Sequence, residues 1–308
     1  MKKIINCFND ESSSGLGDFL RGSAYMYQTC KEKNINFDID FSNHKLNKFL
    51  KSRNTHKVKN SEIINLSEKI KREKKHFDGT NDFFAEMESQ LLEIINNVKH
   101  NETKHICTNY SNLMKIKEDY VSTEINNSIQ ITKECSSWLK ENLVFAPYVD
   151  SLASIELCRN NLQEKRYHLM HFRLGDEISF LGLSLIGKNM NFEDYFEICK
   201  KTSEELNMPI LVISDSNKLK NKIKEMSEKE GLDIKVATTF SSHTQKKPSK
   251  KATKNLQVED VGLLGAAVDS KLISLSASVY SYSVYFWGSG FATWISQIYG
   301  VPIKIHQL

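Results

Sequence analysis

The chain has 308 residues, of which 40% are hydrophobic and 26% are charged. This composition is typical of a globular protein and excludes a disordered or collagen-like chain; the length predicts about two domains. The net charge of +4 is too weak to indicate a dedicated nucleic-acid-binding protein. No apolar run is long enough for a membrane-spanning helix.

Six cysteines are scattered along the chain, and none stands in a Cys-x-x-Cys pair. This spacing predicts neither a zinc site nor a thioredoxin-like redox site. In a chain of this size the thiols are expected to be reduced and partly buried. Because the N-terminal segment also lacks the apolar core of a signal peptide, the expected compartment is the cytoplasm.

The first half of the chain opens as an α/β domain. The apolar runs 4–8 and 35–41 predict two strands, which are joined by a glycine turn at 12–18 and a helix. Residues 43–130 are rich in Lys, Asn and Glu, and they predict surface helices and long connections around a small sheet. The order strand, helix, strand is typical of a layered α/β architecture.

The second half alternates strands and helices more clearly. Strands are predicted over 167–173, 210–214, 234–237 and 271–275, and helices over 192–207, 217–229, 260–268 and 286–298. This alternation indicates a parallel, doubly wound sheet, and such sheets bind ligands at the carboxyl ends of their strands. We expect one domain over residues 1–155 and a second over 156–308.

A lysine-rich segment interrupts the second half at 241–255. Its five lysines, one proline and near absence of apolar residues predict a loop. The segment is interpreted either as a solvated surface loop or as a lid that steers phosphates.

The strongest chemical signal is the stretch HFRLGD at 171–176, at the carboxyl end of a predicted strand. His171 and Arg173 are two residues apart, so on a strand they project from the same face. An arginine there suits planar recognition of a phosphate. The alternative is a buried Arg–Asp ion pair beside a core histidine.

A second signal is the glycine turn around Gly15, Gly17 and Asp18. A helix N-terminus offers free N–H groups to an anion, and glycine allows the anion to approach closely. The turn departs from the full dinucleotide-binding fingerprint, and a simple tight turn is the alternative.

Further polar residues cluster near predicted strand ends and helix starts. Asp260 is expected to head a helix, with Ser276, Ser278, Ser281 and Ser283 around the end of the next strand. Hydroxyl and N–H groups at such a turn could cradle a phosphate, although ordinary serine capping explains them equally well.

Two aspartate-containing strand ends leave similar alternatives open. Asp215 follows a predicted strand, where it could accept a hydrogen bond from a base or ribose, or cap the next helix. Asp38 and Asp40 form an Asp-x-Asp pair that could hold a divalent metal. Because apolar residues alternate with these two aspartates, a structural role is the preferred interpretation.

The order of these motifs resembles that of the fucosyltransferase superfamily, which includes α1,2-, α1,6- and protein O-fucosyltransferases. The matching motifs are a glycine turn, an H-x-R-x-G-D motif, a Ser-Asp strand end and an acidic helix start followed by S-x-[FY]-S; here these are residues 15–18, 171–176, 214–215, Asp260 and 278–281. The Gly-Asp ending and the aromatic segment 286–288 are similar to the α1,2 branch. Leu174 departs from the pattern, because many relatives carry a second arginine there.

The resemblance implies the GT-B glycosyltransferase fold, in which two Rossmann-like domains face each other across a cleft. Residues 1–155 would form the acceptor side, with a Lys/Asn-rich helical insertion, and residues 156–308 would bind the nucleotide sugar. The implied enzyme is an inverting glycosyltransferase that moves L-fucose from GDP-fucose to a hydroxyl of a glycan acceptor, with an α1,2 linkage favoured. The resemblance implies no metal and no other cofactor.

The resemblance also implies roles for individual residues. Arg173 would bind the β-phosphate of the donor. By their position in the chain, Asp176 and Glu177 are the candidates for the general base, with Asp18 as a further alternative. The donor-binding residues would be Gly15, Gly17, Asp18, His171, Arg173, Ser214, Asp215, Asp260, Ser278, Tyr280 and Ser281. A guanidinium group and hydroxyls that stabilise the departing GDP would make a metal unnecessary.

Three alternative functions stay open at this stage. A transferase of the same fold could use another nucleotide sugar such as GDP-mannose, or the protein could be a non-catalytic module that binds a sugar nucleotide or glycan. The third hypothesis, a dinucleotide-dependent oxidoreductase, is supported only by the first glycine turn. No nucleic-acid partner and no membrane span are expected.

Overall fold

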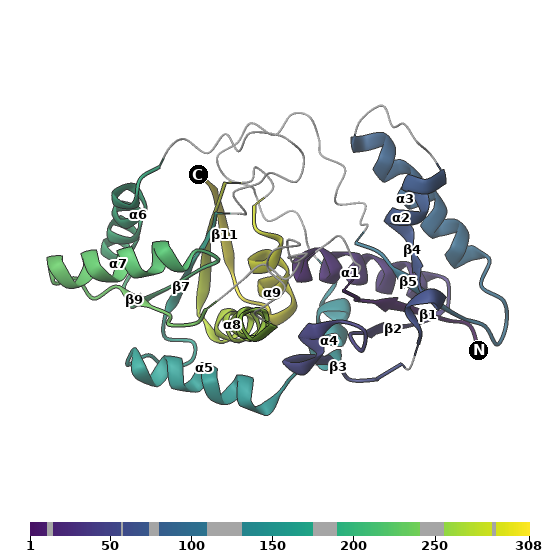
Figure 1. Ribbon diagram of the computed structural model, residues 1–308, viewed down its shortest axis with the longest axis horizontal. Coiled ribbons are helices and arrows are strands. Elements are labelled where there is room, and N and C mark those ends of the chain that lie inside the picture. The colour runs from purple at the N-terminus through teal and green to yellow at the C-terminus, as the bar shows by residue number, and fades with distance from the viewer. Residues whose placement is uncertain are drawn as a thin grey trace. The chain divides into compact units, whose positions relative to one another are not determined.

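The computed structural model describes residues 1–10, 15–56, 58–73, 80–109, 131–174, 190–240, 256–284 and 288–308. Their contacts divide them into two compact units, the first holding the described residues up to Val144 and the second holding those from Phe145 to Leu308. Each unit contains a parallel sheet with helices packed against it, as Figure 1 shows for each unit separately. Helix α5 belongs wholly to the second unit, so the expected boundary after residue 155 falls inside this helix.

The first unit is built on a four-stranded sheet with the order β2-β1-β5-β4 and on a small sheet of β3 and β6. Its strands are β1 (Lys3–Cys7), β2 (Asn36–Asp40), β3 (Leu50–Ser52), β4 (Ile64–Asn65), β5 (Thr103–Cys107) and β6 (Leu143–Phe145). Its helices are α1 (Leu16–Glu32), α2 (Leu66–Glu73), α3 (Thr80–Asn96) and α4 (Lys133–Asn142), with 3-10 turns η1 (Lys45–Lys48) and η2 (Asn60–Glu62).

The faces of the first sheet differ in what covers them. Ile4 and Ile106 point to one face, where they pack with Met26 of α1 and Leu91 of α3 in the main core. Side chains alternate along a strand, so Asp38 and its neighbours on the other face meet the segment that follows β2. The core therefore lies between the sheet and its helices, as expected for an α/β layer.

The second unit carries a five-stranded sheet with the order β11-β10-β7-β8-β9. Its strands are β7 (His168–Arg173), β8 (Ile210–Ser214), β9 (Lys235–Val236), β10 (Ser278–Ser283) and β11 (Ile303–Gln307). Its helices are α5 (Pro147–Arg159), α6 (Phe192–Glu205), α7 (Asn217–Glu230), α8 (Leu256–Leu275) and α9 (Gly290–Tyr299). All paired strands run parallel, which confirms the expected sheet type.

Helices cover both faces of this sheet. Met170 and Phe172 pack with Phe196 of α6 and Ile223 of α7 in one core cluster. Residues of the opposite strand face meet α9, whose Phe291 ring lies 5.9 Å from that of His171. Figure 1 shows α6 and α7 together on one side of the strands and α9 on the other.

One predicted strand is wrong. Residues 271–275 complete the long helix α8, and the strand that follows is β10, at Ser278–Ser283. Leu272 and Ile273 are fully buried in the helix, and a continuous apolar run has the same appearance in a buried helix and a buried strand. Two further expectations change with it. Asp260 lies inside α8 rather than at its start. Ser278, Ser281 and Ser283 lie along β10, and Ser276 lies in the link before it, rather than at a turn after a strand.

The cysteine expectation is confirmed, because all six thiols are free and all except Cys158 are buried. Among the helices of the described residues, none has the length and apolar character needed to cross a membrane.

Candidate functional site

The second sheet reverses its winding direction between β7 and β10. Strands β8 and β9 continue on one side of β7, whereas β10 and β11 lie on its other side. In open α/β sheets, ligands bind outside the carboxyl ends of the strands at such a switch point. The residues that end β7, β8 and β10 therefore form the candidate site.

A polar stripe crosses this point on one face of the sheet. In the strand register, His171 lies beside Ser281 and Arg173 lies beside Ser283. The His171 Nδ1 and Ser281 Oγ atoms are 3.3 Å apart, within hydrogen-bond distance. Two motifs that are far apart in the sequence thus become neighbours, because parallel strands place their carboxyl ends at one edge.

Arg173 is paired with Asp215 at this edge. Its Nη1 donates to Asp215 Oδ2, and Asp215 Oδ1 accepts from the backbone N–H of Leu174 at 2.9 Å. The two side chains are 14% and 17% exposed, so the pair is sheltered but reaches solvent. The Arg–Asp ion pair expected as the alternative is therefore present, and its acid is Asp215.

The serines next to Asp215 are structural. Buried Ser214 donates through Oγ to the Phe172 carbonyl at 2.9 Å and accepts from Ser216 N–H at 3.0 Å. Ser216 caps α7 by accepting from Leu219 N–H at 3.2 Å. The N-cap of α7 is thus Ser216, and the helix begins directly after it.

His171 is kept neutral by its surroundings. Burial lowers its pKa to about 4, and the charge of Arg173 adds to this effect while Asp215 opposes it. The N-terminus of α9 begins next to Phe291, capped by Ser289, which accepts from Ala292 N–H at 3.4 Å. Arg173 and this helix end both favour a negatively charged ligand.

Two other predicted donor-binding residues, Ser278 and Tyr280, lie nearer the amino end of β10. Ser278 begins β10, where its Oγ is 2.7 Å from His168 Nδ1. The Tyr280 ring packs against His168 and below the ammonium of Lys304. Asp260 lies half-buried in the second turn of α8. Asp176, Glu177, the aromatic pair 286–287 and the loop 241–255 lie outside the described residues.

The predicted glycine turn stands in the first unit, at the start of α1. Gly15 is the N-cap and makes no side-chain capping bond, and Gly17 is buried in the first turn. Asp18 pairs with Arg21 at 3.0 Å. A helix follows the first strand as the sequence predicts, but it starts at Leu16, so Gly17 and Asp18 of the predicted turn 12–18 lie in its first turn. Residues 12–14 of that turn lie outside the described residues.

Sequence reasoning missed Gly22, in the second turn of the same helix. A Cβ atom here would lie 2.6 Å from the Thr108 carbonyl oxygen and 2.8 Å from Asn109 Cα. Only glycine lets α1 pack this closely against the end of β5. The sequence did contain a signal, because Gly22 is a third glycine downstream of Gly15 and Gly17. In dinucleotide-binding turns the third glycine allows the helix to pack closely against the strand.

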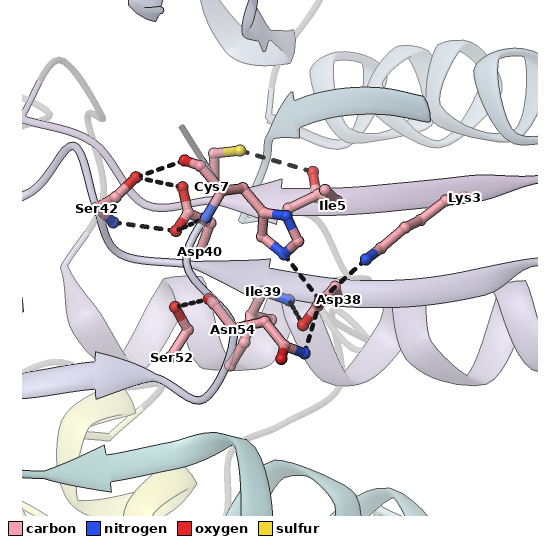
Figure 2. A network of polar contacts seen from close by, with 10 residues as sticks. Lys3, Ile5, Cys7, Asp38, Ile39, Asp40, Ser42, Ser52 and Asn54 are labelled. Carbon is pink, nitrogen blue, oxygen red and sulfur yellow. Dashed lines mark hydrogen bonds and ion pairs between the residues drawn. The ribbon is translucent and has the colours of Figure 1, made fainter. Parts of the chain in front are cut away.

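The Asp-x-Asp pair is enclosed by hydrogen-bond donors, as Figure 2 shows. Asp38 accepts from Lys3 Nζ at 3.2 Å, Asn54 Nδ2 at 3.0 Å and His56 Nε2 at 2.8 Å. Asp40 accepts from the hydroxyl of Ser42 at 2.5 Å. Such an arrangement supports the structural interpretation, and within the described part of the chain no three His, Cys, Asp or Glu residues group as metal ligands.

Comparison with solved structures finds the same fold along the chain. The α1,6-fucosyltransferase NodZ from Bradyrhizobium, in a crystal soaked with GDP-fucose, has a TM-score of 0.53 and 11% sequence identity, covering 100% of this chain and 99% of that one. A variant of FUT1 from Arabidopsis thaliana in complex with GDP has a TM-score of 0.53 and 11% identity, covering 98% of this chain and 69% of that one. No protein-family model and no curated protein matches the sequence. The likeness shows that this chain has the GT-B fold.

Proposed function

We propose that this protein is an inverting glycosyltransferase that transfers L-fucose from GDP-fucose to a hydroxyl group of a glycan acceptor. The observation that carries the proposal is the position of Arg173 beside His171 and Ser283 at the switch point of the second sheet. The fold adds support, since NodZ with the same fold was crystallised and soaked with GDP-fucose.

In this proposal the second unit binds the donor. Arg173 holds the diphosphate, and Asp215 orients the guanidinium through the ion pair. When the acceptor hydroxyl attacks the anomeric carbon, the bond to GDP breaks and negative charge develops on the departing phosphate. Arg173, Ser281 and the N-terminus of α9 stabilise that charge without reorganising, which is an effective form of catalysis. These groups supply the charge that a metal would otherwise provide.

The acceptor side and the proton acceptor belong to the same proposal. The first unit binds the acceptor, and Gly15, Gly17, Asp18, Asp260, Ser278 and Tyr280 stay assigned to donor binding by the motif resemblance. Asp176 or Glu177 removes the proton of the attacking hydroxyl. The Gly-Asp ending of the motif favours an α1,2 linkage, and the cytoplasm is the proposed compartment.

The test measures thermal stability with GDP, GDP-fucose, GDP-mannose, UDP-glucose or NAD, each in the presence of EDTA. A ligand that binds the native state raises the melting temperature. We expect a rise with GDP and GDP-fucose alone, undiminished by EDTA. A rise with NAD or UDP-glucose and none with GDP would contradict the proposed donor.

Turnover then separates an enzyme from a binding module. Incubation with GDP-fucose and a panel of glycans, followed by detection of released GDP and fucosylated product by mass spectrometry, should show transfer. Tight GDP binding without any transfer or hydrolysis would indicate a non-catalytic module.

A further inference from the structure

Two threonines that follow β9 are held by charged residues from three helices. The Thr238 N–H donates to Glu156 Oε2 at 3.0 Å, and its hydroxyl donates to Oε1 of the same carboxylate. The Thr239 carbonyl accepts from Lys220 Nζ, and the Thr239 hydroxyl donates to Asp269 Oδ1 at 2.7 Å. Glu156 belongs to α5, Lys220 to α7 and Asp269 to α8.

These charges are deeply buried. Glu156 is 5% exposed, and Lys220 and Asp269 are 3% exposed. Burial lowers the pKa of Lys220, and the negative charges of Asp269, Glu156 and Asp215 oppose this. Buried charge clusters often stabilise a fold no better than apolar side chains of the same volume. Because these buried charges all bond to the same two-residue turn, their role is to fix the position of that turn rather than to stabilise the fold in general.

The position of the turn is not set by packing alone. Thr238 and Thr239 line a cavity of about 280 Å³ together with Phe240 and residues of α5 and α8. One side of the turn thus faces open space. The hydrogen bonds to Glu156, Lys220 and Asp269 are what hold it.

The turn and the candidate site share the same edge of the sheet. β9 runs parallel to β8, so Thr238 stands at the carboxyl edge one strand away from Asp215. Lys220 lies in the first turns of α7, which begins just after Asp215, and it donates to the carbonyl of Thr239. Lys220 therefore ties the threonine turn to the helix that starts at the candidate site.

We infer that Lys220 is a positioning residue of the nucleotide-sugar site: its buried ammonium holds the Thr238–Thr239 turn at the carboxyl edge of the sheet, one strand away from the Arg173–Asp215 pair, and so keeps that edge shaped for a nucleotide diphosphate. This inference rests on the proposed function. Without the lysine the turn would lose its anchor, and the edge beside Asp215 would no longer be held in place. That change weakens the binding of a nucleotide diphosphate, although Lys220 itself touches no ligand.

The experiment compares K220M and T239V with the control K224M. Lys224 lies on the same helix, is 60% exposed and approaches Glu228 only at 4.0 Å. Calorimetry gives the Kd for GDP, and hydrolysis of GDP-fucose gives KM and kcat, all well below each variant's melting temperature. We expect K220M to raise the Kd and KM about tenfold, which corresponds to about 1.4 kcal/mol, with kcat nearly unchanged. T239V should raise both by a smaller factor, and K224M should match the wild type.

The outcomes separate the two proposals. If the wild type does not bind GDP, the proposed function and this inference both fail. If the wild type binds GDP and K220M binds it equally well, only the inference fails, and a lower melting temperature alone would indicate a purely structural lysine. If K220M does not fold, the Kd for GDP is measured on T239V and on the charge-balanced double variant K220M/D269N instead. A wild-type Kd in both variants would overturn the inference.

Discussion

Each unit holds an acid that is bonded to basic side chains, and the two acids differ in how far they are enclosed. Asp38 lies in the middle of β2, 3% exposed, and its carboxylate is taken up by Lys3, Asn54 and His56 (Figure 2). Asp215 stands just beyond the end of β8, where it pairs with the part-exposed Arg173. A charged pair at the carboxyl end of a strand stays within reach of solvent, whereas an acid in the middle of a strand is enclosed in the fold.

The pKa shifts of titratable groups near these two acids also differ between the units. Burial raises the pKa of the Cys7 thiol, and the carboxylates of Asp40 and Asp38 add to the effect. Burial lowers the pKa of His171, which keeps the imidazole uncharged beside Arg173. The first unit thus has a closed network that stabilises its fold, and the second has at its sheet edge an arginine–aspartate pair that reaches solvent.

The largest effect is expected from removing the buried charge of Asp38 from the hydrogen-bonded network of the first unit. Asp38→Asn leaves the Lys3 ammonium and its neighbours without a buried carboxylate, and we expect the free energy of unfolding of the first unit to fall by about 3–5 kcal/mol. Urea denaturation measures this change in the free energy of unfolding, and hydrogen exchange of β1 and β2 reports it locally. Glu134→Gln, which removes an exposed partner of Lys31, should cause no measurable change. GDP affinity that fell with Asp38→Asn in the folded protein would contradict the division between the units.

The second largest effect is expected from removing the guanidinium group at the edge of the second sheet. Arg173→Ala should lower the rate of fucose transfer by about 10²–10³, the typical loss for a group that stabilises developing charge. The fold should persist, because Asp215 is 17% exposed and can be hydrated. Steady-state kinetics and circular dichroism check both statements, with Arg166→Ala as the exposed control. Near-normal turnover in a folded Arg173→Ala protein would refute the assignment.

The third prediction concerns pH. Because the folded-state pKa of His171 is about 4 and its ordinary value is 6.5, the unfolded chain binds a proton first as the pH falls. Stability should therefore decline between pH 6.5 and 4 by roughly 3 kcal/mol and be unaffected by this group above 6.5. His171→Gln should abolish that part of the decline, as measured by urea midpoints at several pH values. Parallel curves for both proteins would show that His171 does not carry the effect.

The smallest effect is expected at Gly22 in the first unit. Alanine there would place a Cβ atom 2.6 Å from the Thr108 carbonyl oxygen, and we expect a destabilisation of about 1–3 kcal/mol from the forced shift. The test is stringent, since alanine elsewhere in a helix is favoured over glycine by about 1 kcal/mol. Equal or higher stability of Gly22→Ala in urea would mean that α1 can move away from β5 at no cost.

Much of the second unit could be predicted because its elements carry strong local patterns. The strand 210–214 is found with the predicted bounds, and α6 and α7 begin at their predicted residues. Each has an apolar run or an amphipathic face with a capping residue before it. The failure at 271–275 has the opposite cause, because α8 is buried on nearly all sides and its apolar run has no period that distinguishes helix from strand.

The candidate site was only partly predictable. His171, Arg173, Asp215 and Ser281 were each singled out from local motifs, and the structure brings them together at the edge of β7, β8 and β10. Ser278 and Tyr280 belong to the same motif as Ser281 and lie nearer the amino end of the strand. Lys220 and Asp269 had no local signal, because their roles depend on side chains and backbone that are distant in sequence. Gly22 stood in a glycine-rich segment, but its close approach to Thr108 is seen only in the structure.

By itself the sequence determined the alternation of elements, the parallel sheets and the residue types able to bind a phosphate, because these depend on short-range periodicity and local capping. Only the tertiary structure decided the strand order, and with it the switch point between β7 and β10. It also decided that Arg173 pairs with Asp215, while Asp38 is enclosed by Lys3 and His56. The physical reason is that a charge acquires its role from its partners and its access to water, and both are set by chain segments that meet only when the sheet forms.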